Sequence, residues 1–262
     1  MLKKTKYTFE DLIEIMKMLR SENGCPWDRE QTHESLKKYL IEEAYEVLEA
    51  IDSGEKHKMC EELGDLLLQV VFHSQIALEN GSFCMDDVID GICKKLIIRH
   101  SHVFGDDNAN TADDVMTFWE ANKKKEKNYK TQTDVLKSVP ANLPALMRSY
   151  KVQQKASDAG FDWDDIKDAI LKLYEEIAEL QNVYKSKDME IITDEAGDVL
   201  FSVVNVCRFL KVQPEIALSK TTEKFIKRFE FIENEALKCG KNLEEMSLQE
   251  MDELWEKAKK QN

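Results

Sequence analysis

Glycine and proline are scarce in this chain, which has only 9 Gly and 4 Pro among 262 residues. Tight turns depend on these two residues, so their scarcity argues against a turn-rich β-structure. A charged fraction of 34% is typical of long helices. The sequence also lacks convincing alternation of apolar and polar residues over strand-length windows. It therefore predicts an all-α protein.

Long apolar runs are absent as well. No segment approaches the roughly 18 apolar residues of a membrane-spanning helix, and the N-terminus lacks the apolar core of a signal peptide. The six cysteines are scattered without a Cys-x-x-Cys pair, which argues against a zinc site or a disulfide framework. We expect reduced thiols, a cytoplasmic location and no membrane partner.

Three motifs of nucleotide and hydrolase chemistry are also missing. G-x-x-x-x-G-K-[ST], G-x-G-x-x-G and G-x-S-x-G do not occur, so P-loop, dinucleotide-binding and nucleophile-elbow chemistry find no support. A net charge of −14 argues against polymeric nucleic acid as a partner, because phosphate backbones attract basic surfaces. The charge is compatible with a small phosphorylated ligand bound through divalent cations.

The most informative feature that is present is a pattern of five acids that occurs twice. In each half of the chain, Glu-Glu-x-x-Glu is followed by Glu-x-x-Asp at the same spacing. The first copy comprises Glu42, Glu43, Glu46, Glu62 and Asp65, and the second comprises Glu175, Glu176, Glu179, Glu195 and Asp198. This repetition favours two tandem domains of similar structure.

Helical spacing predicts four long helices in each half. They are expected at 9–19, 34–51, 58–77 and 86–100, then at 143–159, 166–184, 191–210 and 215–237, with further helices at 115–128 and 249–260. The stretch Cys25-Pro26-Trp27-Asp28 is expected to form a loop. A polar stretch ending at Pro140 predicts a linker over 131–141, which separates domains 1–130 and 142–262. Each domain is expected to be a four-helix bundle.

The spacing of the acids points to a divalent cation. Glu43 and Glu46 lie one helical turn apart and can converge, while Glu62 and Asp65 begin a helix that is apolar nearly all round and should be buried. Carboxylates buried together repel one another unless a cation joins them. Oxygen ligands favour Mg²⁺ or Mn²⁺. The predicted metal ligands are Glu43, Glu46, Glu62 and Asp65 in the first copy and Glu176, Glu179, Glu195 and Asp198 in the second.

Two other interpretations of these helices stay open. The acids could form a solvated helix face, although their identical spacing in both copies favours the metal. Gly64 and Gly197 stand between the paired acids of the third helix in each half, where a glycine costs about 1 kcal/mol relative to alanine. A tight helix crossing or room for a metal or phosphate would each explain them.

Cations and tryptophans recur after each set of acids. Lys95 and Arg99, then Lys224 and Arg228, each have the i, i+4 spacing that points two cations from one helix face, and such pairs supplement a metal in binding phosphates. A tryptophan further along the chain after each pair is a candidate for stacking on a base, with a place in the core as the alternative. The candidate substrate-binding residues are Lys95, Arg99 and Trp119 in the first half and Lys172, Lys224, Arg228 and Trp255 in the second.

Together these motifs resemble those of the MazG nucleotide pyrophosphohydrolases, a family within the all-α NTP pyrophosphatase superfamily. Besides the paired acids, the resemblance is carried by residues 24–33, Gly-Cys-Pro-Trp-Asp-Arg-Glu-Gln-Thr-His, and by 159–163, Ala-Gly-Phe-Asp-Trp. It covers nearly the whole chain. It implies two tandem MazG-like helical bundles that pair as homodimers and, with Mg²⁺, convert NTPs and dNTPs to nucleoside monophosphate and pyrophosphate, a house-cleaning of the nucleotide pool.

The resemblance also implies roles for individual residues. The four predicted ligands of each copy would hold the metal, and Lys224, Arg228 and Trp255 would hold phosphate and base. Our hypothesis is that a remaining carboxylate orients or deprotonates a metal-bound water, while Lys224 and Arg228 stabilise the leaving pyrophosphate. The candidate catalytic residues are therefore Glu42, Glu175, Glu176, Lys224 and Arg228.

Two alternative functions remain from the sequence. The repeats could form a non-catalytic Mg²⁺- and nucleotide-binding sensor or a helical scaffold. Alternatively, the enzyme could be narrow in substrate, as in the dUTPase-like and phosphoribosyl-ATP pyrophosphohydrolases of the same superfamily. A narrow enzyme should discriminate sharply between bases, whereas a broad one should accept most of them.

Overall fold

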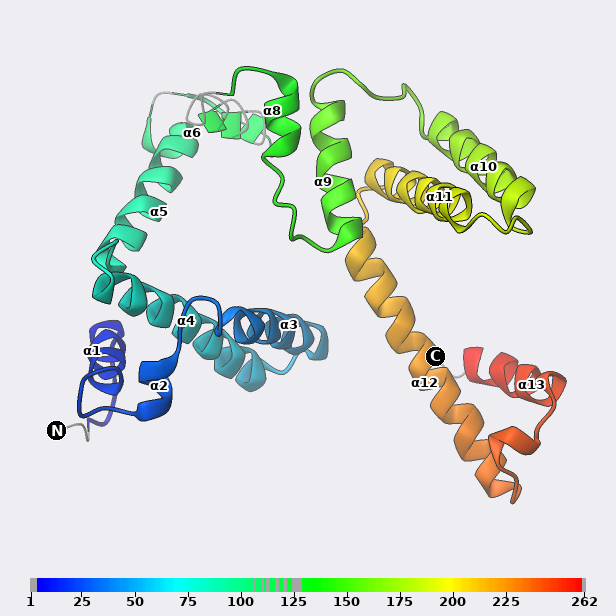
Figure 1. Cartoon of the computed structure of the whole chain (residues 1–262), viewed down its shortest axis with the longest axis horizontal. Helices are drawn as coiled ribbons and strands as arrows, with labels where there is room; N and C mark the ends of the chain where they lie inside the picture. The colour runs from blue at the N-terminus through cyan, green and yellow to red at the C-terminus, as the bar shows by residue number, and fades with distance from the viewer. Residues whose placement is uncertain are drawn as a thin grey trace. The chain divides into compact units, whose positions relative to one another are not determined.

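The computed structural model describes residues 4–260 except 106, 110, 112–113, 116–117, 120–121 and 124–128. Within these residues the regular elements are helices and no strand occurs, which confirms the all-α prediction. The chain divides into two compact units, Met1–Lys127 and Asn128–Asn262, whose helices are labelled in Figure 1. No helix in the described part of the chain combines the length and apolar character needed to cross a membrane.

The first unit is built on a helical hairpin. Its helices are α1 (Phe9–Leu19), α2 (Pro26–Glu30), α3 (Lys37–Ser53), α4 (Lys56–Glu79), α5 (Met85–Arg99) and α6 (Ser101–Phe104). α3 packs along α4, and α1 packs on α4. Gly54 joins the two hairpin helices with a left-handed φ of 71°, a conformation that glycine adopts without the strain of a side chain.

The second unit repeats that hairpin. Its helices are α8 (Gln132–Lys137), α9 (Ala145–Ser157), α10 (Ile166–Val183), α11 (Met189–Phe209), α12 (Pro214–Lys238) and α13 (Leu248–Lys259), with a short 3-10 helix at Leu243–Glu245. α10 packs along α11, α9 packs on α11 and α12, and α13 turns back onto α12 (Figure 1). The four long helices predicted in each half are thus present as α1, α3, α4 and α5, then α9, α10, α11 and α12.

Two short helices replace predicted irregular segments. The expected loop around Trp27 contains α2, whose first residue is Pro26, because proline at the first helical position already has a helical φ. The segment 131–141, expected as a linker, contains α8, which Thr131 and Asp134 cap reciprocally. The helix expected at 115–128 lies partly outside the described residues, and the domain boundaries stay a prediction.

The core of the first unit lies where α1, α3 and α4 meet. Its buried side chains are Met16, Leu36, Val71, Phe72 and Ile76, with Phe9, Leu12, Ile13, Tyr39, Leu68 and Met85 packed against them. The first half of α4 is less covered than the sequence indicated, because Leu63, Leu67 and Val70 are exposed in the single chain. The expectation that this helix is buried all round is therefore wrong for one copy of the chain.

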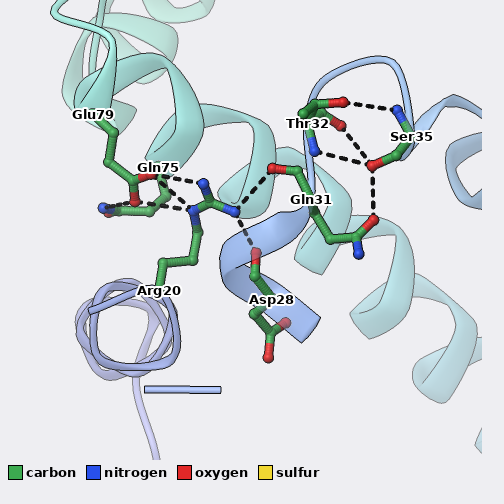
Figure 2. A network of polar contacts seen from close by, with 7 residues as sticks. All are labelled: Arg20, Asp28, Gln31, Thr32, Ser35, Gln75 and Glu79. Carbon is green, nitrogen blue, oxygen red and sulfur yellow. Dashed lines mark hydrogen bonds and ion pairs between the residues drawn. The ribbon is translucent and has the colours of Figure 1, made fainter. Parts of the chain in front are cut away.

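A buried arginine fastens α1 and α2 to α4 (Figure 2). Arg20 donates from Nε to Glu79 Oε1 over 2.9 Å and from Nη2 to Oε2 over 2.7 Å. Its Nη1 donates to the backbone carbonyls of Asp28 and Gln31, while Gln75 donates to the same Glu79 carboxylate. The hydrogen bonds from Arg20 lower the pKa of Glu79. The Arg20 guanidinium thus joins α1 and α2 to α4, the helix that carries Glu62 and Asp65.

The second unit has a similar ion pair, but the positions of the arginine and the acid are exchanged. Here the arginine is on the acid-bearing helix: Arg208 of α11 donates to both carboxylate oxygens of Asp162, in the segment between α9 and α10. Arg208 also donates to Asn205, and Ser157 donates to Asp162. In both units a bidentate pair holds the segment that precedes the acid-bearing hairpin onto the hairpin's second helix.

Loss of the Arg20 guanidinium should destabilise the first unit. In Arg20→Ala, the Gln31 carbonyl loses its Arg20 donor, while the Asp28 carbonyl and the Glu79 carboxylate each keep one other donor; an acceptor left unsatisfied costs about 1–3 kcal/mol. Urea unfolding followed by circular dichroism should show a lower midpoint. Lys17→Ala, which removes an exposed cation paired with Glu14, should shift the midpoint by far less. Equal shifts for both variants would contradict the role assigned to Arg20.

Candidate metal and nucleotide site

The first acid cluster forms between the two helices of the α3–α4 hairpin. Glu43 lies one turn before Val47 and two turns before the buried Ala50, so it belongs to the stripe of α3 that faces α4. Ligand oxygens of Glu43, Glu62 and Asp65 lie within 4.8 Å of one another, and all three residues are half-buried. Three of the four predicted ligands therefore meet, each with an oxygen available to one cation.

The fourth predicted ligand of this copy, Glu46, lies at the edge of the cluster. It is exposed, but its charge still acts on its neighbours. Burial raises the pKa of Glu43, and the carboxylates of Asp65, Glu46 and Glu62 raise it further. Burial likewise raises the pKa of Glu62, with Glu46 and Glu61 as the next causes. The protein thus brings like charges together at a cost that a bound cation would relieve.

The second cluster has the same location but a different set of ligands. Ligand oxygens of Glu176, Glu179 and Glu195 lie within 4.8 Å of one another. Glu176 is buried on the stripe of α10 that also holds the buried Ala169. A hydrogen bond with Glu176 raises the pKa of Glu179, and burial and the charges of Glu176 and Glu195 add to the rise. Asp198 is exposed and does not join the group, whereas its counterpart Asp65 does.

The residues present fit a hard divalent cation. Oxygen is the only donor in either cluster, which suits Mg²⁺ or Mn²⁺. Glu195 Oε2 is buried without a hydrogen-bond partner, and such an orphaned atom needs a ligand to satisfy it. Apart from the adjacent residues and the backbone of the same helix, no atom of the described residues lies within 4 Å of a Cβ built on Gly64 or Gly197. A tight crossing within the chain therefore does not explain these glycines, and room for a ligand or a second copy remains.

A lysine distinguishes the second cluster from the first. Lys172 lies one turn before the two acids of α10, with its Nζ 2.6 Å from Glu175 Oε1 and 2.8 Å from Glu176 Oε1. The hydrogen bond with Glu175, followed by that with Glu176, raises the pKa of Lys172. The corresponding acid of the first copy, Glu42, is exposed on α3. Both candidate bases, Glu42 and Glu175, thus lie on the solvent side of their clusters.

An arginine stacks on a tryptophan after each cluster. In the first unit the Arg99 guanidinium lies 5.1 Å from the centroid of the Trp119 ring, and Arg99 is only 6% exposed. In the second, the Arg228 guanidinium lies 5.4 Å from the centroid of Trp255. Arg228 is half-buried, and its Nε has no partner. Each predicted arginine and tryptophan are therefore neighbours, in a cation–π geometry.

A second ring lies against each tryptophan, and this contact was not predicted. Phe225 lies 5.2 Å from Trp255, centroid to centroid, and His100 lies 5.1 Å from Trp119 with the two ring planes 79° apart. The signal for Phe225 was in the sequence, because Phe225 precedes Arg228 by three residues and so shares its helix face. His100 directly follows Arg99 and lies beyond α5, where helical spacing gives no such signal.

The structure does not bring the cations and the acids of the second unit together. Lys224 is exposed on α12 and Arg228 lies against α13, whereas the acids lie between α10 and α11. Within the described part of the chain, no hydrogen bond or ion pair joins Lys224 or Arg228 to those acids. Lys95 of the first unit is likewise exposed on α5. Within one chain, the predicted metal ligands and the predicted phosphate-binding cations therefore lie apart.

Comparison with known families matches both halves of the chain. The sequence model of the MazG nucleotide pyrophosphohydrolase domain matches residues 31–104 and again 165–231. These two segments contain every predicted metal ligand. Both Lys and Arg pairs also lie inside them, whereas Trp119 and Trp255 lie outside.

Individual relatives match over nearly the whole length. The nucleoside triphosphate pyrophosphohydrolase/pyrophosphatase MazG of Thermotoga maritima is 48% identical over 98% of this chain and 98% of its own length. The nucleoside triphosphate pyrophosphohydrolase of Escherichia coli K12 is 42% identical over 95% of this chain and 96% of its own. An uncharacterized protein, YabN, of Bacillus subtilis is 48% identical over 97% of this chain, which covers 52% of that protein.

Proposed function

The chain belongs to the MazG nucleotide pyrophosphohydrolase family, and we propose that it hydrolyses nucleoside triphosphates to nucleoside monophosphate and pyrophosphate. The single observation that carries the proposal is the pair of acid clusters within the family segments, each with three ligand oxygens mutually within 4.8 Å. Hydrolysis of NTPs and dNTPs to clear the nucleotide pool is the expected role. A cytoplasmic location stays a prediction from the sequence.

The cation of this reaction is proposed to be Mg²⁺, with Mn²⁺ as a substitute. In the second unit Glu176, Glu179 and Glu195 would hold it, with Asp198 as the fourth ligand once its exposed carboxylate turns inward. When bound, the cation supplies charge neutralisation for the triphosphate and an acidified water. Glu175 lies next to the cluster on the solvent side, so its carboxylate can accept the proton of the attacking water.

The second unit is proposed to carry the main activity. Arg228 is half-buried, and its Nε is buried in the single chain without a hydrogen-bond partner, so a phosphate that approaches this guanidinium would supply the missing acceptor. Arg99 is almost fully buried with its guanidinium over the Trp119 ring, and His100 lies 5.1 Å from the same ring, nearly perpendicular to it. Trp255 also has an arginine and a ring against it, Arg228 and Phe225, so the two units differ in the burial of the arginine and not in the access to the tryptophan. The first unit is therefore better suited to holding a metal than to holding a nucleotide.

The complete site is proposed to form in a homodimer. Leu171 and Tyr174 of α10, Leu200 and Phe201 of α11, and Phe225 of α12 are all exposed in the single chain. Large exposed apolar surface marks a protein interface. Four-helix bundles bury such faces around one core, and a second copy related by two-fold symmetry would add its α10 and α11 to this pair. The same partner can bring its Lys224 and Arg228 to the acids.

Product analysis tests the proposed reaction. The purified protein is incubated with each NTP and dNTP plus Mg²⁺, and monophosphate, diphosphate, pyrophosphate and orthophosphate are resolved. We expect monophosphate and pyrophosphate in equal amounts, and no product with EDTA. Diphosphate and orthophosphate would contradict cleavage at the α–β bridge. No turnover of any nucleotide would favour the alternative of a non-catalytic sensor or scaffold.

A further inference from the structure

The two acid clusters differ in one internal cation. In the second unit, Lys172 contacts Glu176 at 2.8 Å, and Glu176 is one of the three acids that can share a metal. The lysine side chain is 37% exposed and the glutamate side chain only 8%. This ion pair therefore lies at the mouth of the cluster, with its cation on the solvent side and its anion inside.

The first unit has no lysine at the equivalent position. The same spacing from the acids places Tyr39 there, and Tyr39 packs against the apolar core and against Trp27. The preceding Lys38 lies over the Tyr39 ring, 4.5 Å from its centroid. Lys58, one turn before Glu62, forms its ion pair with Glu49, which is not a predicted ligand. Among the residues that the structure describes, the first cluster thus shows no ion pair of the kind that Lys172 makes.

We propose that Lys172 couples metal binding to nucleotide binding in the second repeat. It pairs with Glu175 and Glu176 in the absence of ligand and disfavours a divalent cation bound alone. When the metal–triphosphate complex binds, Lys172 turns from the acids to the phosphates. The first repeat, with Tyr39 at this position, binds a divalent cation without nucleotide more tightly than the second. The inference rests on the proposed function, because it takes the second acid cluster to be the metal site.

Electrostatic repulsion between Lys172 and the metal would produce this coupling. A lysine bound to a ligand oxygen both occupies a lone pair of Glu176 and places a positive charge within a few ångströms of the incoming cation, where repulsion is strong in a partly buried site. A triphosphate removes that conflict, because its several negative charges attract the metal and the lysine together. By linkage, the nucleotide must then strengthen metal binding by the same factor as the metal strengthens nucleotide binding. Lys172 is thus a positioning residue with respect to the metal.

The test is a Mn²⁺ titration in which electron paramagnetic resonance measures the concentration of unbound Mn²⁺. Glu62→Gln disables the first cluster, so that binding reports the second. In that background and without nucleotide, Lys172→Met should tighten Mn²⁺ binding about tenfold, roughly the effect of removing a nearby unit charge in a partly screened site. Lys167→Met, which removes a cation from the same helix without an ion pair to the acids, should leave Mn²⁺ affinity unchanged. Lys172→Gln should shift binding in the same direction as Lys172→Met and serves as a second variant.

The nucleotide arm uses α,β-methylene-ATP, which cannot be cleaved at the α–β bridge. In the Lys172 wild-type background the analogue should strengthen Mn²⁺ binding, and Lys172→Met should remove most of that gain. Tyr39→Lys, placed in a Glu176→Gln background so that only the first cluster reports, should weaken Mn²⁺ binding there.

Two results would overturn the inference in distinguishable ways. One such result is unchanged Mn²⁺ affinity in Lys172→Met and Lys172→Gln while the second cluster still binds Mn²⁺. It would show that Lys172 and the metal contact Glu176 together without competing, which overturns the inference and leaves the proposed function intact. Absence of Mn²⁺ binding at the second cluster, with and without the analogue and in every variant, would overturn the inference together with the proposed metal site.

Discussion

Glu176→Gln is expected to lower the turnover of nucleoside triphosphates by about 10²–10³-fold, the range seen when one charge-stabilising group is removed from an active site. Glu176 is the buried member of the second cluster and shares its ligand space with Glu179 and Glu195. Glutamine keeps the size of the side chain but removes the negative charge that a divalent cation requires. Steady-state release of pyrophosphate in the presence of Mg²⁺ measures the effect.

The matched control for this change is Glu43→Gln. Glu43 occupies the equivalent position in the first cluster, so the two variants alter the same chemistry in different repeats. Because Arg99 of the first repeat is almost fully buried whereas Arg228 of the second is half-buried, Glu43→Gln should retain most of the wild-type turnover. The reverse pattern, with activity lost in Glu43→Gln and kept in Glu176→Gln, would assign the reaction to the first repeat. Circular dichroism establishes that both variants keep their helices.

Mixing two inactive variants is expected to restore activity. If the partner supplies Lys224 and Arg228 to the acids of each subunit, a heterodimer of Glu176→Gln with Arg228→Ala contains one site with all of its groups intact and one site with both defects. Random exchange of subunits makes about half of the dimers mixed, and only one of the two sites in each is intact. We therefore expect roughly a quarter of wild-type turnover, from the symmetry of a two-fold dimer.

The control for complementation is a mixture of two variants whose substitutions both lie in the acid cluster of the second unit. Glu176→Gln mixed with Glu195→Gln should stay inactive, because both defects lie in the same acid cluster and every site in the mixed dimer carries one of them. Failure of the first mixture to recover, after subunit exchange has been established by native mass spectrometry, would place the acids and the cations of one site on the same chain. In that case α12 would have to approach the α10–α11 pair within its own subunit.

The helices and the acids could be read from the sequence because both follow from local spacing. The i, i+4 and i+7 positions of α3 place Glu43 with Val47 and Ala50, and the same rule places Glu176 with Ala169. The repeated pattern of five acids then indicated that the two hairpins have similar structures. The Thr131–Asp134 cap of α8 was also a local signal, although it fell in a segment that its polarity and its proline marked as a linker.

Contacts between distant segments could not be read in this way. No spacing rule pairs Arg20 with Glu79 or Arg208 with Asp162, because such pairs depend on how helices far apart in the chain are packed. The sequence likewise gave no reason for Asp65 to join its cluster while Asp198 does not. The apolar circumference of α4 predicted a buried helix, yet Leu63 and Leu67 are exposed in one chain. Hydrophobicity indicates that a face is covered but does not identify what covers it.

The most direct test of the account is a crystal structure with Mn²⁺ and α,β-methylene-ATP, in which anomalous scattering locates the metal. The account predicts Mn²⁺ at about 2.0–2.2 Å from oxygens of Glu176, Glu179 and Glu195, with Lys224 and Arg228 of a second copy on the phosphates. Mn²⁺ bound away from both acid clusters, or a triphosphate bound without contact to these residues, would contradict it.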